Sequence, residues 1–226
     1  MKIKFLAVAI GIMIYGTSAI LHAEGNARAG KDKAASCNSC HGDNGNSAAP
    51  NFPKLAQQHA SYLVKQLQAF KSGARNDPMM SAMALPLSDE DMADIGAYYA
   101  AQKISGNTMP ELPPADEDED EQPAATAGKP KSVPELIALG SDLYRNGDLQ
   151  REVSACIACH GPFGEGNQPA AFPALHSQHA DYLIKALTDF KTGIRGNTPE
   201  NMMHMIAKKM TDEEIRAVAY AISMMK

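Results

Sequence analysis

The sequence predicts an all-α protein that consists of two copies of one small domain. Three observations support this prediction: a five-residue motif occurs twice, the segments that follow the two motifs can be aligned, and apolar residues recur with helical spacing. No run of β-branched residues with strand alternation interrupts these segments. The length of 226 residues is enough for one or two domains.

Residues 1–23 are predicted to be a secretory signal peptide rather than part of the fold. Two lysines precede an apolar run from Phe5 to Ile14, and Leu21-His22-Ala23 fits a cleavage site. The alternative is an uncleaved membrane anchor, but the residues from Tyr15 to Ser18 interrupt the apolar stretch and leave it short for a membrane span. Under both interpretations the rest of the chain is exported, and we expect it in the periplasm.

The repeated motif is C-x-x-C-H, from Cys37 to His41 and again from Cys156 to His160. It is the attachment signature of c-type haem, in which two thiols form thioethers with the haem vinyl groups and the histidine binds the iron. All four cysteines of the chain belong to the two motifs. We therefore predict two covalently bound haem c groups, with these attachment residues and axial ligands: Cys37, Cys40, Cys156 and Cys159 for the thioethers, and His41 and His160 for the iron.

Three other uses of these cysteines explain the sequence less well. A thioredoxin-like C-x-x-C would lie at a strand–helix junction, and no strand run precedes either motif. A zinc site of two cysteines and two histidines in each half leaves the repeated pentad unexplained. A disulfide within one motif would close a very small loop and would stabilise the fold little.

The similarity of the two halves extends well beyond the motifs. Short segments recur in the same order after each motif, and they begin at Phe52, Gln58, Tyr62 and Phe70 in the first half and at Phe172, Gln178, Tyr182 and Phe190 in the second. We predict a first domain at residues 24–103 and a second at residues 132–226. Residues 104–131 contain five prolines and an acidic run from Asp116 to Glu121. This composition is typical of an extended, solvated linker.

The first helix of each domain precedes its motif. The pattern predicts a helix at residues 27–36 in the first domain. In the second, Ser132 precedes a proline at a first-turn position, and the helix runs to Asn146 with Gly147 as its stop. Each of these helices carries a central glycine, Gly30 or Gly140, where another helix can approach closely.

The later helices have clear end signals and apolar faces. A helix at residues 60–72 ends at Gly73 and has a copy in the second domain. The last helices begin with capping boxes, which pair Ser88 with Asp91 and Thr211 with Glu214. The predicted apolar faces consist of Leu63, Leu67, Phe70, Met92, Ile95 and Tyr99 in the first domain, and of Leu183, Leu187, Phe190, Ile215, Val218 and Ile222 in the second.

The second axial ligand of each iron determines what the haem can do. Methionine gives a closed, low-spin iron at a raised potential, whereas a second histidine would lower the potential and an open position would permit peroxide chemistry. The candidates before the last helices are Met79, Met80 and Met83, and Met202, Met203 and Met205. Met80 and Met203 each stand eight residues before the capping residue of the last helix, so the repeat selects this pair.

Three further pairs of repeated residues lie near the predicted haem sites: His59 with His179, Pro53 with Pro173, and Arg75 with Arg195. The histidines stand at helix starts, which favours a structural role over iron binding. The proline carbonyls are candidates to accept a hydrogen bond from the axial histidines. The arginines are either partners of haem propionates or ordinary solvated side chains.

The charge of the chain makes nucleic acid an improbable partner. The chain has 21 basic and 26 acidic side chains and a formal net charge of −5. Removal of residues 1–23 would take away two lysines and make the chain more acidic. The largest excess of acidic residues lies in the predicted linker.

Both halves resemble the dihaem cytochrome c4 family, in which two class I cytochrome c domains follow each other. The matching segments are CNSCHGDNGNSAAPNFPKL, YLVKQLQAFKSGAR and LSDEDMADIGAYYA, followed by CIACHG, FPALHSQHADYLIKALTDFKTG and MTDEEIRAVAYAI. They cover both units, and the linker, which is longer than the connection in that family, falls outside them. The resemblance implies His/Met ligation with Met80 and Met203 at the methionine positions, and two domains packed with their haems close together.

The resemblance also implies a function. The chain would be a monomeric electron carrier, not an enzyme, between a respiratory donor such as a quinol-oxidising cytochrome bc complex and a terminal oxidase or another acceptor. One alternative is a haem subunit docked to a membrane oxidase, which is favoured if residues 1–23 are kept as an anchor; membrane association of the carrier itself would be loose. Another is a dihaem peroxidase, which the equivalent methionine in each half disfavours.

Overall fold

The structure, a computed structural model, describes residues 25–112, 132–197 and 201–226. Regular structure in these three ranges is helical, apart from two isolated bridges, one between Asp148 and Val153 and one between Asn167 and Phe172. None of the helices in these ranges is both long and apolar enough to cross a membrane. The prediction of an all-α fold is confirmed.

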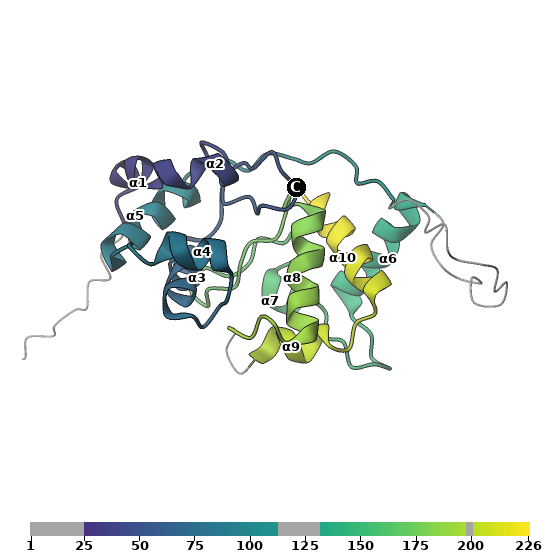
Figure 1. Cartoon of the computed structure of the whole chain (residues 1–226). Helices are drawn as coiled ribbons and strands as arrows, with labels where there is room; N and C mark the ends of the chain where they lie inside the picture. The colour runs from purple at the N-terminus through teal and green to yellow at the C-terminus, as the bar shows by residue number, and fades with distance from the viewer. Residues whose placement is uncertain (1–24, 113–131, 198–200) are drawn as a thin grey trace, which may run out of the picture.

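The helices form two groups that lie side by side (Figure 1). The first group consists of α1 (Ala27–Lys33), the 3-10 turn η1 (Ala34–Ser36), α2 (Asn38–His41), α3 (Ala60–Ser72), α4 (Pro78–Ala84) and α5 (Asp89–Ala100). The second consists of α6 (Val133–Asn146), α7 (Ile157–His160), α8 (Ala180–Thr192), α9 (Met202–Ala207) and α10 (Asp212–Ser223). All the helices expected from the sequence are present, and short helices at the motifs and before the last helices complete each group.

In each group the first helix crosses the last one at a glycine. A Cβ atom on Gly30 of α1 would collide with the backbone oxygen of Asp94 in α5. A Cβ atom on Gly140 of α6 would collide in the same way with Ala217 of α10. The close approach predicted from these glycines is confirmed, and it explains why no larger residue fits at either crossing.

The helix ends follow the sequence signals. The side chain of Ser132 accepts a hydrogen bond from the Glu135 N–H, and both predicted capping boxes are formed. α3 and α8 end at Gly73 and Gly193 with φ angles of 77° and 80°. This left-handed conformation favours glycine, which is why the helices stop there.

Each group has its own apolar core. The predicted faces of the last helices are buried: Met92, Ile95, Tyr99, Ile215, Val218 and Ile222 are at most 3% exposed. Leu67 and Leu187 are only half-buried, but each packs against the core of its own group. Cys37 contacts the first core and Cys156 the second, so the packing of the long helices positions both motifs.

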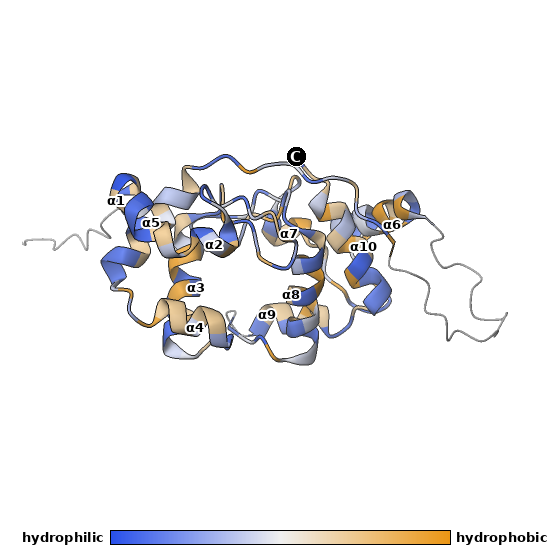
Figure 2. Ribbon diagram, turned by 45° about the horizontal axis from the view of Figure 1, so that its top comes forward, coloured by the Kyte–Doolittle hydropathy of each residue, from blue (hydrophilic) through white to orange (hydrophobic). Residues whose placement is uncertain are grey.

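The loops that follow α2 and α7 lie between the two helical groups (Figure 2). The first nine residues of the predicted linker are described, and they contact the second group: Asn107 donates to the carbonyl of Ser223, and Tyr220 donates to the carbonyl of Glu111. The acidic run from Asp116 to Glu121 and the predicted signal peptide at residues 1–23 lie outside the described residues.

Candidate haem-binding sites

A single helical turn holds the cysteines and the histidine of each motif together. The N–H of His41 donates to the carbonyl of Cys37 over 3.0 Å, and the N–H of His160 donates to that of Cys156 over 2.9 Å. A glycine with positive φ follows each histidine and ends the turn. Thiols and imidazole therefore lie on one turn, as the attachment of one haem to both requires.

None of the four cysteines forms a disulfide with another. Burial raises the pKa of Cys37, and it raises the pKa of Cys156 to about 11. Within the described ranges, no three His, Cys, Asp or Glu side chains come close enough together to hold a metal ion.

The two motif histidines are fixed by the proline carbonyls expected from the sequence. Nδ1 of His41 donates to the Pro53 carbonyl over 2.9 Å, and Nδ1 of His160 donates to the Pro173 carbonyl over 3.0 Å. Both rings are buried, and this burial lowers the pKa of each imidazole despite the bond to the carbonyl. A neutral ring with its proton on Nδ1 has its lone pair on Nε2, the atom that can bind iron.

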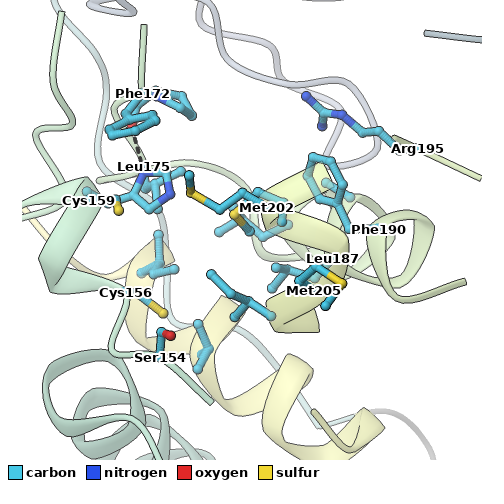
Figure 3. A pocket seen from close by; sticks show the side chains of 18 of the residues that line it. Ser154, Cys156, Cys159, Phe172, Leu175, Leu187, Phe190, Arg195, Met202 and Met205 are labelled. Carbon is cyan, nitrogen blue, oxygen red and sulfur yellow. Dashed lines mark hydrogen bonds between the residues drawn. The ribbon is translucent and has the colours of Figure 1, made fainter. Parts of the chain in front are cut away.

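The motif of the second domain opens onto a cavity of about 510 Å³. Figure 3 shows Cys156 and Cys159 on one side of it, Leu187, Phe190 and Met205 on the other, and Arg195 at its edge. The size and the largely apolar lining suit a planar apolar cofactor. Tyr62 and Gln66 of the first domain also line this cavity, so it reaches the contact between the two domains.

All three candidate methionines of the second domain, Met202, Met203 and Met205, line this cavity. In the first domain Met80 lies in α4, and its N–H is capped by the side chain of Asp77. Of its neighbours, Met79 is 54% exposed and Met83 is 36% exposed. The assignment of Met80 and Met203 as the second iron ligands therefore stays a prediction based on the repeat.

Arg75 and Arg195 lie at the contact between the domains. Arg195 donates to the hydroxyl of Tyr62 over 2.9 Å, and Arg75 donates to that of Tyr182 over 3.3 Å, so each arginine reaches the other domain. Arg195 is only 6% exposed, and the solvated alternative is wrong for it. Burial raises the pKa of Tyr182, but the two guanidinium groups outweigh this effect and lower it to about 8.

Gln66 connects the two arginines and breaks the symmetry of the repeat. Its side-chain oxygen accepts hydrogen bonds from Arg75 over 2.8 Å, from Arg195 over 3.1 Å and from Asn197 over 2.9 Å. The repeat places Ala186 at the corresponding position of the second domain. Neither guanidinium is paired with a carboxylate of the described residues, so the cluster has positive charge without a protein anion.

The other repeated histidines have structural roles, as predicted. His59 and His179 precede α3 and α8, and their rings bond to backbone carbonyls across the domain contact. Nε2 of His59 donates to the carbonyl of Glu165 over 2.8 Å, and Nε2 of His179 donates to that of Ser47 over 2.9 Å. The sequence indicated a helix start but not the contact with the other domain.

Sequence reasoning missed the buried glutamines beside these histidines. Gln58 and Gln178 are each 6% exposed and bond to the backbone of the opposite domain. The repeated Gln-His pair was the available signal. Glutamine is not among the preferred helix-capping residues, so its presence before both helices suggested a role other than capping. Their role becomes visible only when the two domains are placed together.

The residues present fit haem c in both domains. Each has two cysteines and a buried imidazole on one turn, with the imidazole proton held on Nδ1, so that Nε2 could bind iron. In the second domain a cavity with largely apolar walls adjoins these groups. Each domain thus carries a cysteine pair of the kind that two covalent haem c groups require.

Comparison with known proteins identifies the family. The family model "Cytochrome c" matches residues 27–103 and 137–223. Cytochrome c4 of Azotobacter vinelandii is 42% identical over 218 residues, covering 92% of this chain and 93% of that protein. Cytochrome c4 of Pseudomonas aeruginosa is 41% identical over 209 residues, covering 92% of each chain. The crystal structure of reduced recombinant cytochrome c4 from Pseudomonas stutzeri has a TM-score of 0.77 and 39% identity, and it is matched over 89% of this chain and 100% of that one.

These matches extend over both domains and agree with the repeat, the helix crossings and the two motifs. Cytochrome c4 proteins are dihaem electron carriers rather than enzymes. The chain belongs to the cytochrome c4 family.

Proposed function

We propose that the chain carries electrons in the periplasm from a respiratory donor, such as a quinol-oxidising cytochrome bc complex, to a terminal oxidase or another acceptor. The observation that carries this proposal is the pair of equivalent haem sites in one molecule, each with a buried, carbonyl-bound histidine. A bound haem c supplies an iron that cycles between the ferric and ferrous states. An exported chain suits this role, and residues 1–23 are the proposed export signal.

The residues that hold the two haems follow from the motifs and the repeat. Cys37 and Cys40 form the thioethers of the first haem, and Cys156 and Cys159 form those of the second. His41 and Met80 are the axial ligands of the first iron, and His160 and Met203 those of the second. Ligation of each iron by a methionine and a histidine would leave no iron position open and would raise the reduction potential, which favours electron transfer over peroxide chemistry.

Arg75 and Arg195 are proposed to bind haem propionates. The Arg195 guanidinium lines the cavity of the second domain where Gln66 of the first domain also lines it, and Gln66 connects it to Arg75. Arg75 packs over Phe70 at 4.5 Å and Arg195 over Phe190 at 4.4 Å. Both guanidinium groups donate to the oxygen of Gln66, and neither is paired with a carboxylate of the described residues, so a propionate would offset their charge. A propionate at the haem edge has the charge and the geometry for two parallel hydrogen bonds to arginine.

Spectroscopy of the purified protein tests the haem assignment. A haem count of two, with low-spin His/Met signals from both in the optical and magnetic circular dichroism spectra of the ferric form, is expected. A bis-histidine signal would contradict the methionine ligation, and a high-spin signal from either haem would contradict the carrier function.

The donor and acceptor are tested separately by stopped-flow kinetics with isolated complexes. Reduction by a purified cytochrome bc complex and reoxidation by a terminal oxidase should both be fast and should slow with added salt, since protein docking is steered by charge. Failure of both reactions, with two His/Met haems present, would leave a dihaem carrier with other partners. Mass spectrometry of the mature N-terminus decides between a cleaved signal and an anchor.

A further inference from the structure

One peptide group in each domain contacts both the axial histidine and the opposite domain. In the first domain this is the peptide between Pro53 and Lys54. Its carbonyl accepts the Nδ1–H of His41 over 2.9 Å, and its N–H donates to the side-chain oxygen of Gln178 over 2.8 Å. A single peptide therefore lies between the imidazole of one domain and the amide of the other.

The second domain repeats the arrangement in the opposite direction. The carbonyl of the peptide between Pro173 and Ala174 accepts the Nδ1–H of His160 over 3.0 Å. Its N–H donates to the side-chain oxygen of Gln58 over 2.9 Å. Each domain thus supplies a glutamine to the histidine-binding peptide of the other, so the connection is reciprocal.

The orientation of both amides is determined by their neighbours. The oxygen of Gln58 also accepts the N–H of His59, and that of Gln178 accepts the N–H of His179, both over 3.0 Å. Two backbone donors converge on each of these atoms, so the atom must be the oxygen. The amide nitrogen of Gln58 donates to the Ala174 carbonyl over 2.8 Å, and that of Gln178 donates to the Lys54 carbonyl over 2.9 Å. Each glutamine therefore forms two hydrogen bonds with the backbone of a single residue in the other domain.

Hydrogen bonds in such a chain strengthen one another. When the peptide N–H donates to an amide oxygen, its carbonyl becomes more negative and accepts the imidazole N–H more strongly. A stronger bond at Nδ1 makes the imidazole a better electron donor to its metal. More electron density at the iron favours the ferric state and lowers the reduction potential.

Burial strengthens the electrostatic effect of these hydrogen bonds. Gln58 and Gln178 are each 6% exposed, and the two histidines are 6% and 8% exposed. In such surroundings a lost bond is not replaced by water, and its full electrostatic effect is felt. These connected hydrogen bonds also depend on the domain contact, because the glutamine oxygen that accepts the peptide N–H always belongs to the other domain.

We propose that Gln178 tunes the haem held by His41 and that Gln58 tunes the haem held by His160, so that each haem potential is adjusted by the opposite domain. The proposal rests on the ligation by His41 and His160 proposed above. Docking of the domains then lowers both potentials, and a change in their contact alters them.

The experiment replaces each glutamine with methionine, which keeps the shape of the side chain and removes the amide. In Gln178→Met the potential of the first haem should rise while that of the second stays unchanged, and in Gln58→Met the reverse should occur. Spectroelectrochemistry gives the potentials, and NMR of protein labelled with ¹⁵N-histidine assigns them to the two domains. In the reduced Gln178→Met variant, the Lys54 amide proton should exchange with solvent about tenfold faster, as the loss of one hydrogen bond predicts.

Ser61→Ala is the matched control, because it removes another hydrogen bond between the domains, from the Ser61 hydroxyl to the Gln168 carbonyl, without contact with either peptide. It should leave both potentials unchanged. A shift of both potentials in either glutamine variant, or a shift only in the variant's own domain, would overturn the proposal and leave the glutamines with a packing role.

A measurement on the unmodified protein keeps the proposal testable if a variant does not fold. NMR of the reduced form should detect scalar couplings across the bonds from His41 to Pro53 and from Lys54 to Gln178. Absence of the second coupling would overturn the connection between the domains. The haem count and the ligation spectra are independent of these results, so failure of the tuning is distinguishable from failure of the proposed ligation.

Discussion

A backbone carbonyl decides which nitrogen of each motif histidine is available to the iron. Because Pro53 and Pro173 hold the Nδ1 protons, only Nε2 of each ring has a free lone pair. The sequence supported this pairing through the repeated Phe-Pro dipeptides alone.

Methionine ligation is tested residue by residue. Met80→Ala and Met203→Ala should each remove about half of the methionine-to-iron absorption of the ferric protein, because each variant opens one of two equivalent iron positions. The measurement is the optical spectrum, scaled to the haem content.

Neighbouring methionines provide the controls for this prediction. Met83→Ala in the first domain and Met202→Ala in the second should keep the full absorption. Loss of the band in either of them would show that the repeat selects the wrong methionine. The second control matters because Met202 lines the same cavity as Met203.

Several residues of the site could be predicted from the sequence because their chemistry is local. The two cysteines and the histidine of each motif lie within one helical turn, and the spacing alone brings them together. The role of Arg195 could not be predicted in this way, since its partners Tyr62 and Gln66 belong to the other domain. Residue spacing contains no information about contacts between two domains.

At the scale of helices, the crossing glycines allow two helix backbones to approach closely. Gly30→Ala should destabilise the first domain by about 1–3 kcal/mol or more, because the new Cβ has to displace the backbone of α5. The measurement is denaturation by guanidinium, followed by circular dichroism.

Gly106→Ala is the control for this effect, because a Cβ atom at Gly106 would meet no atom within 4 Å. Its denaturation midpoint should stay within experimental error of the unmodified protein. Equal midpoints for Gly30→Ala and Gly106→Ala would contradict the tight crossing of α1 and α5.

An ion-pair cluster joins the same two helices in the first domain. Lys33 bonds to Asp94 over 2.7 Å and to Asp91 over 2.9 Å. Its ammonium group, with help from Ser88 at Asp91, holds the pKa of both carboxyl groups below the usual range. The repeat puts Ala217 at the place of Asp94, so the second domain lacks this pair.

This cluster predicts a pH dependence for the stability of the first domain. The carboxyl groups have a lower pKa in the folded state, so the unfolded chain binds protons first as the pH falls below about 4. Their contribution to stability is complete above that pH and is lost as the pH falls through the folded pKa values. In Lys33→Met the free energy of unfolding of the first domain should fall less steeply as the pH decreases. Denaturant titration of the first unfolding transition from about pH 5 downward measures this change.

A second lysine variant shows whether the effect depends on this cluster. Lys185 pairs with Asp189 on the surface of the second domain, and its side chain is 61% exposed. Exposed pairs contribute little to stability, so Lys185→Met should not change the acid decline of the first transition. Equal flattening by both variants would mean that net charge, rather than the pairing of Lys33, is responsible.

At the scale of the whole molecule, the fold of each domain was predictable and their contact was not. Periodicity, caps and glycines predicted the helices correctly because these signals act within a few residues, as at Ser88 and Gly73. The bonds of Gln58 and Gln178 join residues more than a hundred positions apart. Composition also suggested that the linker begins at residue 104, whereas Asn107 is bound to the second domain.

Asn107 is the clearest point at which to weaken this contact. Its side-chain nitrogen donates to the carbonyls of Ser177, Gln178 and Ser223 over 2.9, 3.1 and 3.0 Å. Its side-chain oxygen accepts a hydrogen bond from the ammonium group of Lys54 over 2.7 Å. Lys54 is only 3% exposed, and this burial lowers the pKa of its ammonium group, so the charge depends on its partners.

We expect Asn107→Ala to weaken the coupling between the domains by about 1–3 kcal/mol, because it leaves buried carbonyls and part of a buried ammonium unpaired. Calorimetry should show the two domains unfolding at more widely separated temperatures, while each keeps its own haem spectrum. Asn44→Ala is the control, since its side-chain oxygen accepts bonds from Asn46 of its own domain. If Asn107→Ala and Asn44→Ala unfolded alike, Asn107 would not hold the domains together, and the contact would depend on the glutamines and the arginine cluster.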